Sequence, residues 1–327
     1  ASALPGKGSF LKGAPPLEHR PYYYLGGNRG LTRLSSGEPF VVYSASRDIA
    51  TWIILNGEWE NFVDDVLMTF VRPGDVAVDV GANMGYYSVK LGNRVGEAGT
   101  LFAFEPHPDL AEVLFENIGI NDLRRRTTIF RAAAGDKQEM ARLIYHPSFS
   151  GGGTVRSLKI GAGKGQASVE IEMVRLDDAL RKVARIDLIK LDAEGSEPRV
   201  LLGARELLGR SPDAVIVTEF WWNAWKAVCD PVGLLSDVAR GRRIFHIRTD
   251  GGLLELRQDD LEPYLSAGGM MYLLLVPETP GRRGQLDALL RRSAAAGRKN
   301  GGGFFGAVRR NCGRYASKLR ARANGGI

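Results

Sequence analysis

The stretch Asp75-Val-Ala-Val-Asp79-Val-Gly81-Ala-Asn83-Met-Gly85 decides the fold of this 327-residue chain. Apolar residues alternate up to Asp79 and predict a buried strand, and the two glycines after it predict a sharp turn. Glycine at such a turn lets the backbone approach a ligand closely. A helix predicted from about Tyr86 directs its free amide N–H groups toward the same place. The stretch therefore predicts a ligand-binding turn between a strand and a helix.

Two acids indicate which ligand this turn accepts. The carboxylate of Asp79 would repel a pyrophosphate but suits an ammonium group or a ribose hydroxyl. The next predicted strand, residues 101–105, ends in Glu105, 20 residues after Gly85. A carboxylate there can accept hydrogen bonds from both ribose hydroxyls, each worth roughly 1.5–3 kcal/mol. The pair favours S-adenosylmethionine (SAM), whose methionine end carries an amine.

A nicotinamide dinucleotide is the alternative ligand for such a turn. Its fingerprint is G-x-G-x-x-G, whereas the glycines here are spaced G-x-x-x-G. Asn83 also stands where a pyrophosphate needs bare backbone, so the dinucleotide interpretation is the weaker one. His107 follows Glu105 closely and is placed either to contact the adenine edge or to cap the next helix.

Strands and helices alternate through most of the chain. Apolar residues recur at helical spacing over 48–70, and helices are predicted near 86–92 and 108–118. Strands are predicted near 75–80, 100–105, 128–133, 186–192, 213–219, 242–248 and 270–276. This alternation indicates an α/β fold, with parallel strands joined by crossover helices on both faces of the sheet.

Residues 137–175 interrupt the alternation. The strand-like runs Met140–Tyr145 and Ser168–Leu176 are predicted to pair as an added hairpin. Between them, residues 149–165 are rich in glycine and predict a mobile loop. A long loop in a compact domain is more often functional than idle, so both a lid over the substrate and a plain surface excursion remain open.

Three ionisable residues alternate with apolar ones at the end of the strand near 186–192: Lys190, Asp192 and Glu194. They project to one side of the sheet, and burying them is costly unless they are paired or used. We expect Asp192 or Glu194 to accept a hydroxyl proton, or to bind a divalent cation that does so indirectly, with Lys190 keeping the pair ionised. The structural alternative is a local Lys–carboxylate network that holds the following helix.

The next strand ends in another acid, Glu219, and is followed by three tryptophans. Trp221, Trp222 and Trp225 predict either an apolar wall for a ring-shaped acceptor or the core of a helix. The remaining histidines show no pairing pattern with cysteine or acid. A Ser–His–Asp or zinc site therefore has no support.

At these residues the sequence resembles the FkbM-type SAM-dependent methyltransferases, over about residues 48–277. The matching stretches include Asp79 to Ser88, Phe104-Glu-Pro106, Ala133-Ala-Gly-Asp136, Leu176-Asp-Asp178, Ile189 to Glu197, and Glu219. The resemblance implies a class I methyltransferase fold, with a seven-stranded sheet whose last strand is antiparallel. It also implies O-methylation of a small molecule, sugar or glycan. By that likeness the SAM contacts are Asp79, Gly81, Asn83, Gly85 and Glu105, and Asp192 and Glu194 lie on the acceptor side.

Charge divides the chain into two parts. The net charge is +7, and residues 279–327 hold twelve Lys or Arg against one acid, Asp287. Within 304–322, cations alternate with apolar residues at helical spacing, which predicts a basic amphipathic helix. Such a helix can lie on an anionic membrane or on nucleic acid. The alternative is a solvated tail.

We therefore divide the chain into an irregular lead-in (1–47), a methyltransferase domain (48–278) and a basic tail (279–327). No apolar run approaches the ~20 residues of a transmembrane helix, and the two cysteines suggest no disulfide framework. We expect a cytoplasmic enzyme, with membrane association through the tail as an option. Two rival functions remain. One is a nucleic-acid methyltransferase, but its usual Asn-Pro-Pro-aromatic or catalytic-cysteine pattern is missing. The other is a noncatalytic binding module, and the intact glycines and acids argue against it. The acceptor and the oligomeric state stay open.

Overall fold

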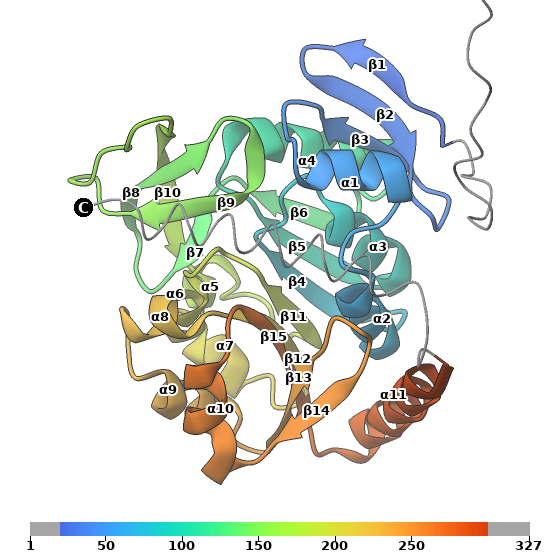
Figure 1. The fold of residues 1–327 in the computed structure, drawn as a ribbon, viewed down its shortest axis with the longest axis vertical. Helices are drawn as coiled ribbons and strands as arrows, with labels where there is room; N and C mark the ends of the chain where they lie inside the picture. Colours follow the sequence, from blue (N-terminus) through green and yellow to red (C-terminus); the bar gives the residue numbers. More distant parts are fainter. Residues whose placement is uncertain (1–19, 300–327) are drawn as a thin grey trace, which may run out of the picture.

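An eight-stranded sheet runs through the centre of the computed structural model, which describes residues 20–299. Its strand order is β14-β13-β15-β12-β11-β4-β5-β6, and helices lie on both sides of it (Figure 1). The strands are β4 (Val76–Val80), β5 (Thr100–Phe104), β6 (Thr127–Phe130), β11 (Leu188–Leu191), β12 (Val215–Phe220), β13 (Arg242–Ile247), β14 (Leu253–Leu256) and β15 (Met271–Pro277).

Most neighbouring strands of this sheet are parallel. β4 pairs in parallel with β5 and β11, β11 with β12, and β5 with β6. β15, the last strand, lies antiparallel between β12 and β13. The predicted α/β sheet with an antiparallel last strand is confirmed. The extra edge strand β14 was not predicted, because its four residues are mostly apolar and show no alternation.

The strand order reverses between β4 and β11. From β4 the chain continues to β5 and β6 on one side, whereas β11 and β12 lie on the other. Open α/β sheets bind ligands beyond the carboxyl ends of the strands at such a point. The turn after Asp79 and the chain after Leu191 therefore face the same region.

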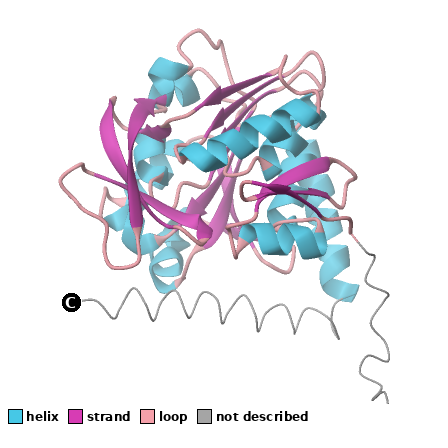
Figure 2. Cartoon of the chain, turned by 90° about the horizontal axis from the view of Figure 1, so that it is seen from above, coloured by secondary structure: helices cyan, strands magenta, loops and turns pink. Residues whose placement is uncertain are grey.

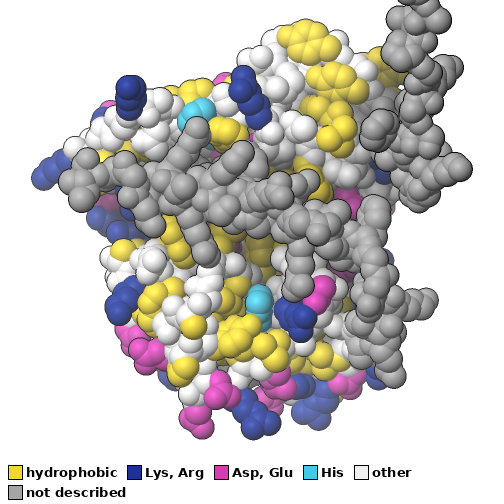
Figure 3. Space-filling view, in the orientation of Figure 1, with side chains coloured by type: hydrophobic (Ala, Val, Ile, Leu, Met, Phe, Trp, Pro, Cys, Tyr) yellow, Lys and Arg dark blue, Asp and Glu magenta, His cyan; other side chains and the backbone are white. Residues whose placement is uncertain are grey.

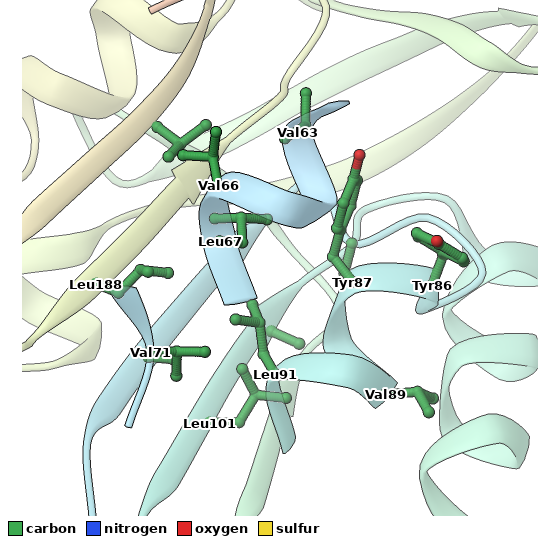
Figure 4. Packing of buried hydrophobic residues seen from close by; sticks show 14 of the residues in the cluster. Val63, Val66, Leu67, Val71, Tyr86, Tyr87, Val89, Leu91, Leu101 and Leu188 are labelled. Carbon is green, nitrogen blue, oxygen red and sulfur yellow. The ribbon is translucent and has the colours of Figure 1, made fainter. Parts of the chain in front are cut away.

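Two hydrophobic cores cover the opposite faces of the sheet. One joins α1 (Ile49–Asn56), α2 (Asn61–Phe70), α3 (Tyr86–Val95) and α4 (Pro108–Ile120) to the sheet. Figure 4 shows part of it, including Val66 and Leu67 of α2 and Leu91 of α3. The other core joins the sheet to α5 (Leu176–Ala179), α6 (Glu197–Leu202), α7 (Arg205–Gly209), α8 (Trp222–Lys226), α9 (Pro231–Val238) and α10 (Leu261–Ala267). A short 3-10 helix, η1 (Gln258–Asp260), precedes α10. Figure 2 shows helices and strands from above.

The N-terminal region contains a small antiparallel sheet, so the predicted irregular lead-in is wrong from Tyr23 onward. Its strands are β1 (Tyr23–Gly26), β2 (Arg29–Arg33) and β3 (Pro39–Tyr43). Val41 of β3 donates its N–H to Oδ1 of Asn117 in α4 (2.6 Å) and accepts a hydrogen bond from Nδ2 of Asn117 (2.8 Å). The sheet thus belongs to the body of the protein. Its outer strand carries exposed hydrophobic side chains, visible at the top of Figure 3.

A second inserted sheet contains the predicted hairpin. Its strands, in the order β7-β10-β8-β9, are β7 (Ala133–Gly135), β8 (Glu139–His146), β9 (Phe149–Arg156) and β10 (Ala167–Arg175). The antiparallel pairing of β8 with β10 confirms the hairpin. Residues 149–156 form β9, so the predicted mobile loop is wrong for that half. Glycine weakens the sequence pattern that predicts a strand. In β9 it permits close packing instead, because a Cβ on Gly153 would lie 3.2 Å from the Leu143 side chain.

The helix α11 (Pro280–Lys299) shows that the first part of the predicted tail packs on the body. The Arg282 side chain is 6% exposed and donates to the backbone carbonyls of Phe70 (2.8 Å), Asp187 (2.8 Å) and Asp213 (3.1 Å). The boundary at 278 therefore does not separate a free tail. The amphipathic helix predicted over 304–322 lies outside the described residues. Within residues 20–299, the helices are too short or too polar to cross a membrane.

Candidate active site

The glycines of the turn are required by the close approach of two chain segments. Gly81 has φ +75°, and a Cβ placed on it would lie 1.7 Å from the backbone oxygen of Asp192. Gly85 has φ +90°, and its Cβ would lie 2.6 Å from Cδ1 of Leu114. Side chains rarely adopt this left-handed backbone. The turn after β4 is therefore in direct contact with the chain that leaves β11.

The backbone N–H groups of the turn are already hydrogen-bonded within the protein. Those of Gly81 and Ala82 donate to the carbonyl of Phe104 (both 3.0 Å), and that of Gly85 donates to the carbonyl of Ala82 (2.8 Å). The remaining two, of Asn83 and Met84, donate to side-chain oxygens. A phosphate needs free N–H donors at such a turn. This turn offers close backbone contact instead, which argues further against a dinucleotide.

The carboxylate of Glu105 links the turn to the end of β5. Its Oε2 accepts the Asn83 N–H and its Oε1 accepts the His107 N–H, both at 2.7 Å. A carboxylate has about four acceptor positions, so each oxygen keeps one for a ligand hydroxyl. Burial raises the pKa of Glu105 to about 7, against the opposing effect of these two N–H donors.

His107 caps the next helix, which was one of its two predicted roles. Its Nδ1 accepts the N–H of Asp109 at 3.2 Å, at the start of α4. Its ring lies edge-on to Tyr145 of β8, with ring centres 4.3 Å apart. Burial lowers the pKa of His107. The adenine contact of His107 stays a prediction.

Lys190 forms a buried bridge between two carboxylates. Its Nζ lies 3.5 Å from Oδ1 of Asp79 and 3.3 Å from Oδ2 of Asp192. Asp79 is fully buried, and its Oδ2 accepts a 2.6 Å hydrogen bond from the Ser88 hydroxyl. Nζ also lies 4.7 Å from the ring centre of Tyr87. Burial lowers the pKa of Lys190, but Asp192 and Asp79 outweigh it and raise the pKa above its usual value. Lys190 is therefore an ammonium ion at neutral pH.

Asp192 keeps one carboxylate oxygen open. Lys190 and the hydroxyl of Tyr272 (3.0 Å) both contact Oδ2. Oδ1 has no hydrogen bond to any residue that the structure describes, and the side chain is 18% exposed. An incoming hydroxyl can therefore approach Oδ1 while Oδ2 is held.

Further carboxyl groups surround Asp192. Glu194 has φ +52° and makes no side-chain hydrogen bond within residues 20–299; burial and the charge of Asp192 raise its pKa to about 8. Oε1 of Glu197 accepts the N–H groups of Ala193 (2.7 Å) and Gly195 (3.1 Å) and so holds the turn after β11. Burial and Asp192 likewise raise the pKa of Glu219, which is 4% exposed. Lys190 and Asp192 are thus brought into contact as predicted, while Glu194 stands apart from the bridge.

Strand β9 reaches the rim of this region, beside α1 (Figure 1). The Asn83 side chain donates to the Ser150 carbonyl at 2.9 Å. The carboxylate of Asp48 accepts the N–H groups of Ser150 (3.1 Å) and Gly151 (2.9 Å). A Cβ on Gly151 would lie 3.8 Å from Oε1 of Glu194. Of the two options for the glycine-rich segment, these contacts favour a cover over the site.

The three tryptophans divide between core and surface. Trp225 is buried and packs on Phe220, with ring centres 4.7 Å apart. Trp222 is half-buried, with Lys226 over its ring. Trp221 is 45% exposed. Only Trp221 remains available as part of a wall for an acceptor.

The predicted metal role of Asp192 and Glu194 gains no support from geometry. In the described part of the chain, no three His, Cys, Asp or Glu side chains are grouped so that they could hold a metal ion. Lys190 instead occupies the position beside Oδ2 of Asp192 that a cation would take.

Residues 79–240 match the family model described as the methyltransferase FkbM domain. The chain belongs to the FkbM methyltransferase family. It is similar to methyltransferase sdnD of Sordaria araneosa, with 30% identity over 39% of this chain and 60% of that protein. The 31-O-demethyl-FK506 methyltransferase FkbM of Streptomyces tacrolimicus is 29% identical over 42% and 62%. The 2-O-methyltransferase NoeI of Sinorhizobium fredii is 30% identical over 46% and 64%. The chain thus spans less than two thirds of each of these relatives.

Two residues of the site lie outside the part that matches the FkbM family model and were missed in the sequence. Tyr272 is a polar residue in the apolar run of β15, and that was the one signal available. Glu60 stands between two helices with φ +42°, and no local pattern distinguishes it from a surface acid. Its Oε2 lies 2.9 Å from the hydroxyl oxygen of Tyr272 and accepts the hydroxyl of Tyr87 (3.2 Å).

Proposed function

We propose that this chain is a SAM-dependent O-methyltransferase that transfers a methyl group to a hydroxyl of a small molecule or sugar. The observation that supports the proposal is that two features face each other where the strand order reverses between β4 and β11. On one side is a glycine turn without free N–H donors, with Glu105 beside it. On the other side is Asp192 with an open oxygen. The first suits an uncharged ribose and the second suits a hydroxyl acceptor.

The residues present fit SAM as the cofactor. Glu105 has acceptor positions left for two ribose hydroxyls, and the turn has no room for a side chain at Gly81 or Gly85. Asp79 acts indirectly in this proposal, because its carboxylate is already held by Ser88 and Lys190. Bound SAM supplies an electrophilic methyl group on a sulfonium. The enzyme's main task is then alignment, which can contribute roughly 7–11 kcal/mol.

Asp192 is the proposed general base. Its Oδ1 takes the proton of the acceptor hydroxyl, and a base typically adds about 10²–10⁴-fold to the rate. Lys190 stabilises the negative charge of Asp192, because its ammonium group lies 3.3 Å from Oδ2. Glu194 lies on the same side and stays a second candidate. Two relatives, a 2-O-methyltransferase and a 31-O-demethyl-FK506 methyltransferase, support a hydroxyl acceptor.

The proposal is tested by incubating the full chain with SAM labelled in its methyl group and an extract of the source organism. We expect label in a small molecule or glycan, which mass spectrometry then identifies, and the label should be stable to mild base, as ethers are. Asp192→Asn should remove most of the transfer, and Asp237→Asn, which changes an exposed carboxylate on α9, serves as the matched control. Label in nucleic acid alone would contradict the proposal and favour the rival class.

A further inference from the structure

Tyr272 connects two carboxyl groups that come from distant parts of the chain. Its hydroxyl lies 2.9 Å from Oε2 of Glu60, before α2, and 3.0 Å from Oδ2 of Asp192, after β11. The hydroxyl of Tyr87 in α3 lies 3.2 Å from the same Glu60 oxygen. Strand register puts Asp79 opposite Lys190, and Tyr272 opposite Glu219, so their side chains share one face of the sheet. Tyr272 therefore belongs to the cluster that contains the Lys190 bridge.

The proton count of this cluster fixes its charge state. A phenol has one proton to donate, so Tyr272 cannot donate to two ionised carboxylates at once. Both contacts are satisfied if one carboxyl is protonated and donates to the Tyr272 oxygen, while Tyr272 donates to the other. Lys190 forms an ion pair with Asp192, and no ion pair joins Lys190 to Glu60 within residues 20–299. Asp192 is therefore the ionised member, and Glu60 carries the proton.

The surrounding charges agree with this assignment. Burial and the charge of Asp192 raise the pKa of Glu60 to about 7, against the charge of Lys190. The other ionisable groups that face the cluster are Asp79 from β4, Glu194 and Glu197 from the chain after β11, and Glu219 from β12. All of these are acids, so they disfavour a further negative charge on Glu60.

We propose that Glu60 and Tyr272 are positioning residues for proton transfer: neutral Glu60 holds Tyr272, and Tyr272 holds Asp192 with Oδ1 toward the acceptor. The inference rests on the proposed function. In the reaction, the acceptor oxygen forms a bond to the methyl carbon as the carbon–sulfur bond breaks and its electron pair stays on sulfur. The hydroxyl proton passes to Oδ1 of Asp192. Glu60 keeps its proton throughout, and Tyr272 continues to donate to Oδ2.

The segments around Glu60 and Tyr272 are therefore part of the site, although both lie outside the family match. Glu60 comes from the junction of α1 and α2, and Tyr272 comes from the last strand. The Gly57–Glu60 break between the helices sets the position of Glu60.

The protonation state of Glu60 can be measured without cofactor or acceptor. The full chain is labelled with ¹³C at the glutamate side-chain carboxyl, and the Glu60 signal is assigned by its loss in Glu60→Gln. We expect this signal to titrate near pH 7. We also expect Tyr272→Phe to lower the midpoint, because the phenol oxygen accepts from the neutral acid. Tyr264→Phe is the matched control, since its hydroxyl bonds His246 elsewhere in the fold. A midpoint near 4, or one that rises in Tyr272→Phe, would overturn the proposal.

A second measurement connects the cluster to the reaction. Transfer of labelled methyl from SAM into the extract is followed against pH for wild type, Tyr272→Phe and Glu60→Gln. Tyr272→Phe should move the acidic midpoint of the rate upward by about one pH unit, the effect of a lost hydrogen bond to a charged group. Glu60→Gln replaces a neutral donor by a neutral donor and should leave that midpoint in place.

The outcomes separate this inference from the proposed function. Methyl transfer with an unmoved midpoint in Tyr272→Phe contradicts the positioning role alone. A midpoint that falls in Glu60→Gln means that a negative charge was removed, and so contradicts a neutral Glu60. Absence of transfer in wild type contradicts the proposed function, and the carboxyl titration then still decides the charge state of the cluster.

Discussion

Replacing Lys190 by methionine should destabilise the protein by about 3–5 kcal/mol, the usual cost of removing one partner from a buried ion pair. Lys190 is 1% exposed and lies within ion-pair distance of both Asp79 and Asp192. Asp79 is fully buried and would keep only the hydrogen bond from Ser88. Methionine fills a similar volume, so lost packing contributes little.

Chemical denaturation measures this loss as a lower midpoint at unchanged slope. Lys137→Met is the matched control, because Lys137 pairs with Glu139 in an exposed ion pair, 2.9 Å long, and such pairs are worth about 0–1 kcal/mol. The loss at Lys190 should be smaller at about pH 5 than at about pH 8. Carboxyl groups without their cation bind protons more readily in the folded variant, so its stability rises as pH falls.

The double variant Lys190→Met/Asp79→Asn identifies the group responsible. It should recover part of the stability, because the second change removes the charge that the first left unpaired. A loss below about 1 kcal/mol in Lys190→Met, or a loss that grows on acidification, would refute the reasoning from the buried bridge.

Three further predictions follow from the site. Gly81→Ala should abolish SAM binding and lower the melting temperature, because its Cβ would collide with the backbone oxygen of Asp192. Gly209→Ala is the control and should do neither, because the space around Gly209 is open. Equal melting curves for the two variants would contradict this prediction. Asp192→Asn should lower the turnover number about 10²–10⁴-fold, and Glu194→Gln should lower it less. SAM affinity should stay nearly unchanged in both variants. A larger loss of turnover in Glu194→Gln than in Asp192→Asn would make Glu194 the base. SAM affinity should fall as pH drops through about 7, because protonation of Glu105 removes an acceptor for the ribose hydroxyls. Calorimetry across this pH range measures the change. A SAM affinity that does not vary with pH would mean that ionised Glu105 takes no part in binding.

Features encoded by neighbouring residues could be predicted from the sequence. The alternation before Asp79 and the spacing of Gly81 and Gly85 define a strand and a turn within eleven residues, and the structure has both. The pairing of β8 with β10 was also predicted, because two strand-like runs flank the glycine-rich segment. Strong local periodicity therefore decided most of the fold.

Contacts between distant residues could not be predicted in this way. Glu60 and Tyr272 are 212 positions apart in the chain, yet their side chains are hydrogen-bonded. In the sequence, Arg282 is one of many cations in a basic tail. In the structure, its guanidinium group is buried and donates to backbone carbonyls. Neither pairing leaves a periodic signal, since each depends on how the helices pack on the sheet.

The contacts of two predicted site residues are known only from the structure. Asp79 was expected to contact the ligand directly, whereas its carboxylate is buried under the turn with Ser88 and Lys190. His107 caps α4 through Nδ1. Sequence spacing places an acid or a histidine at a strand end, but it does not say whether the side chain turns toward the ligand or into the protein.

Calorimetric titration of SAM into wild type and Glu105→Ala tests whether the chain binds SAM through Glu105. We expect one SAM per chain for wild type. In the variant we expect a loss of affinity of roughly 1.5–3 kcal/mol or more, the value of at least one hydrogen bond to a charged group. Glu112→Ala, at a half-exposed carboxylate on the neighbouring helix α4, is the control and should bind as wild type does. Equal affinity in Glu105→Ala with an intact fold, or no binding of SAM to wild type, would contradict the account.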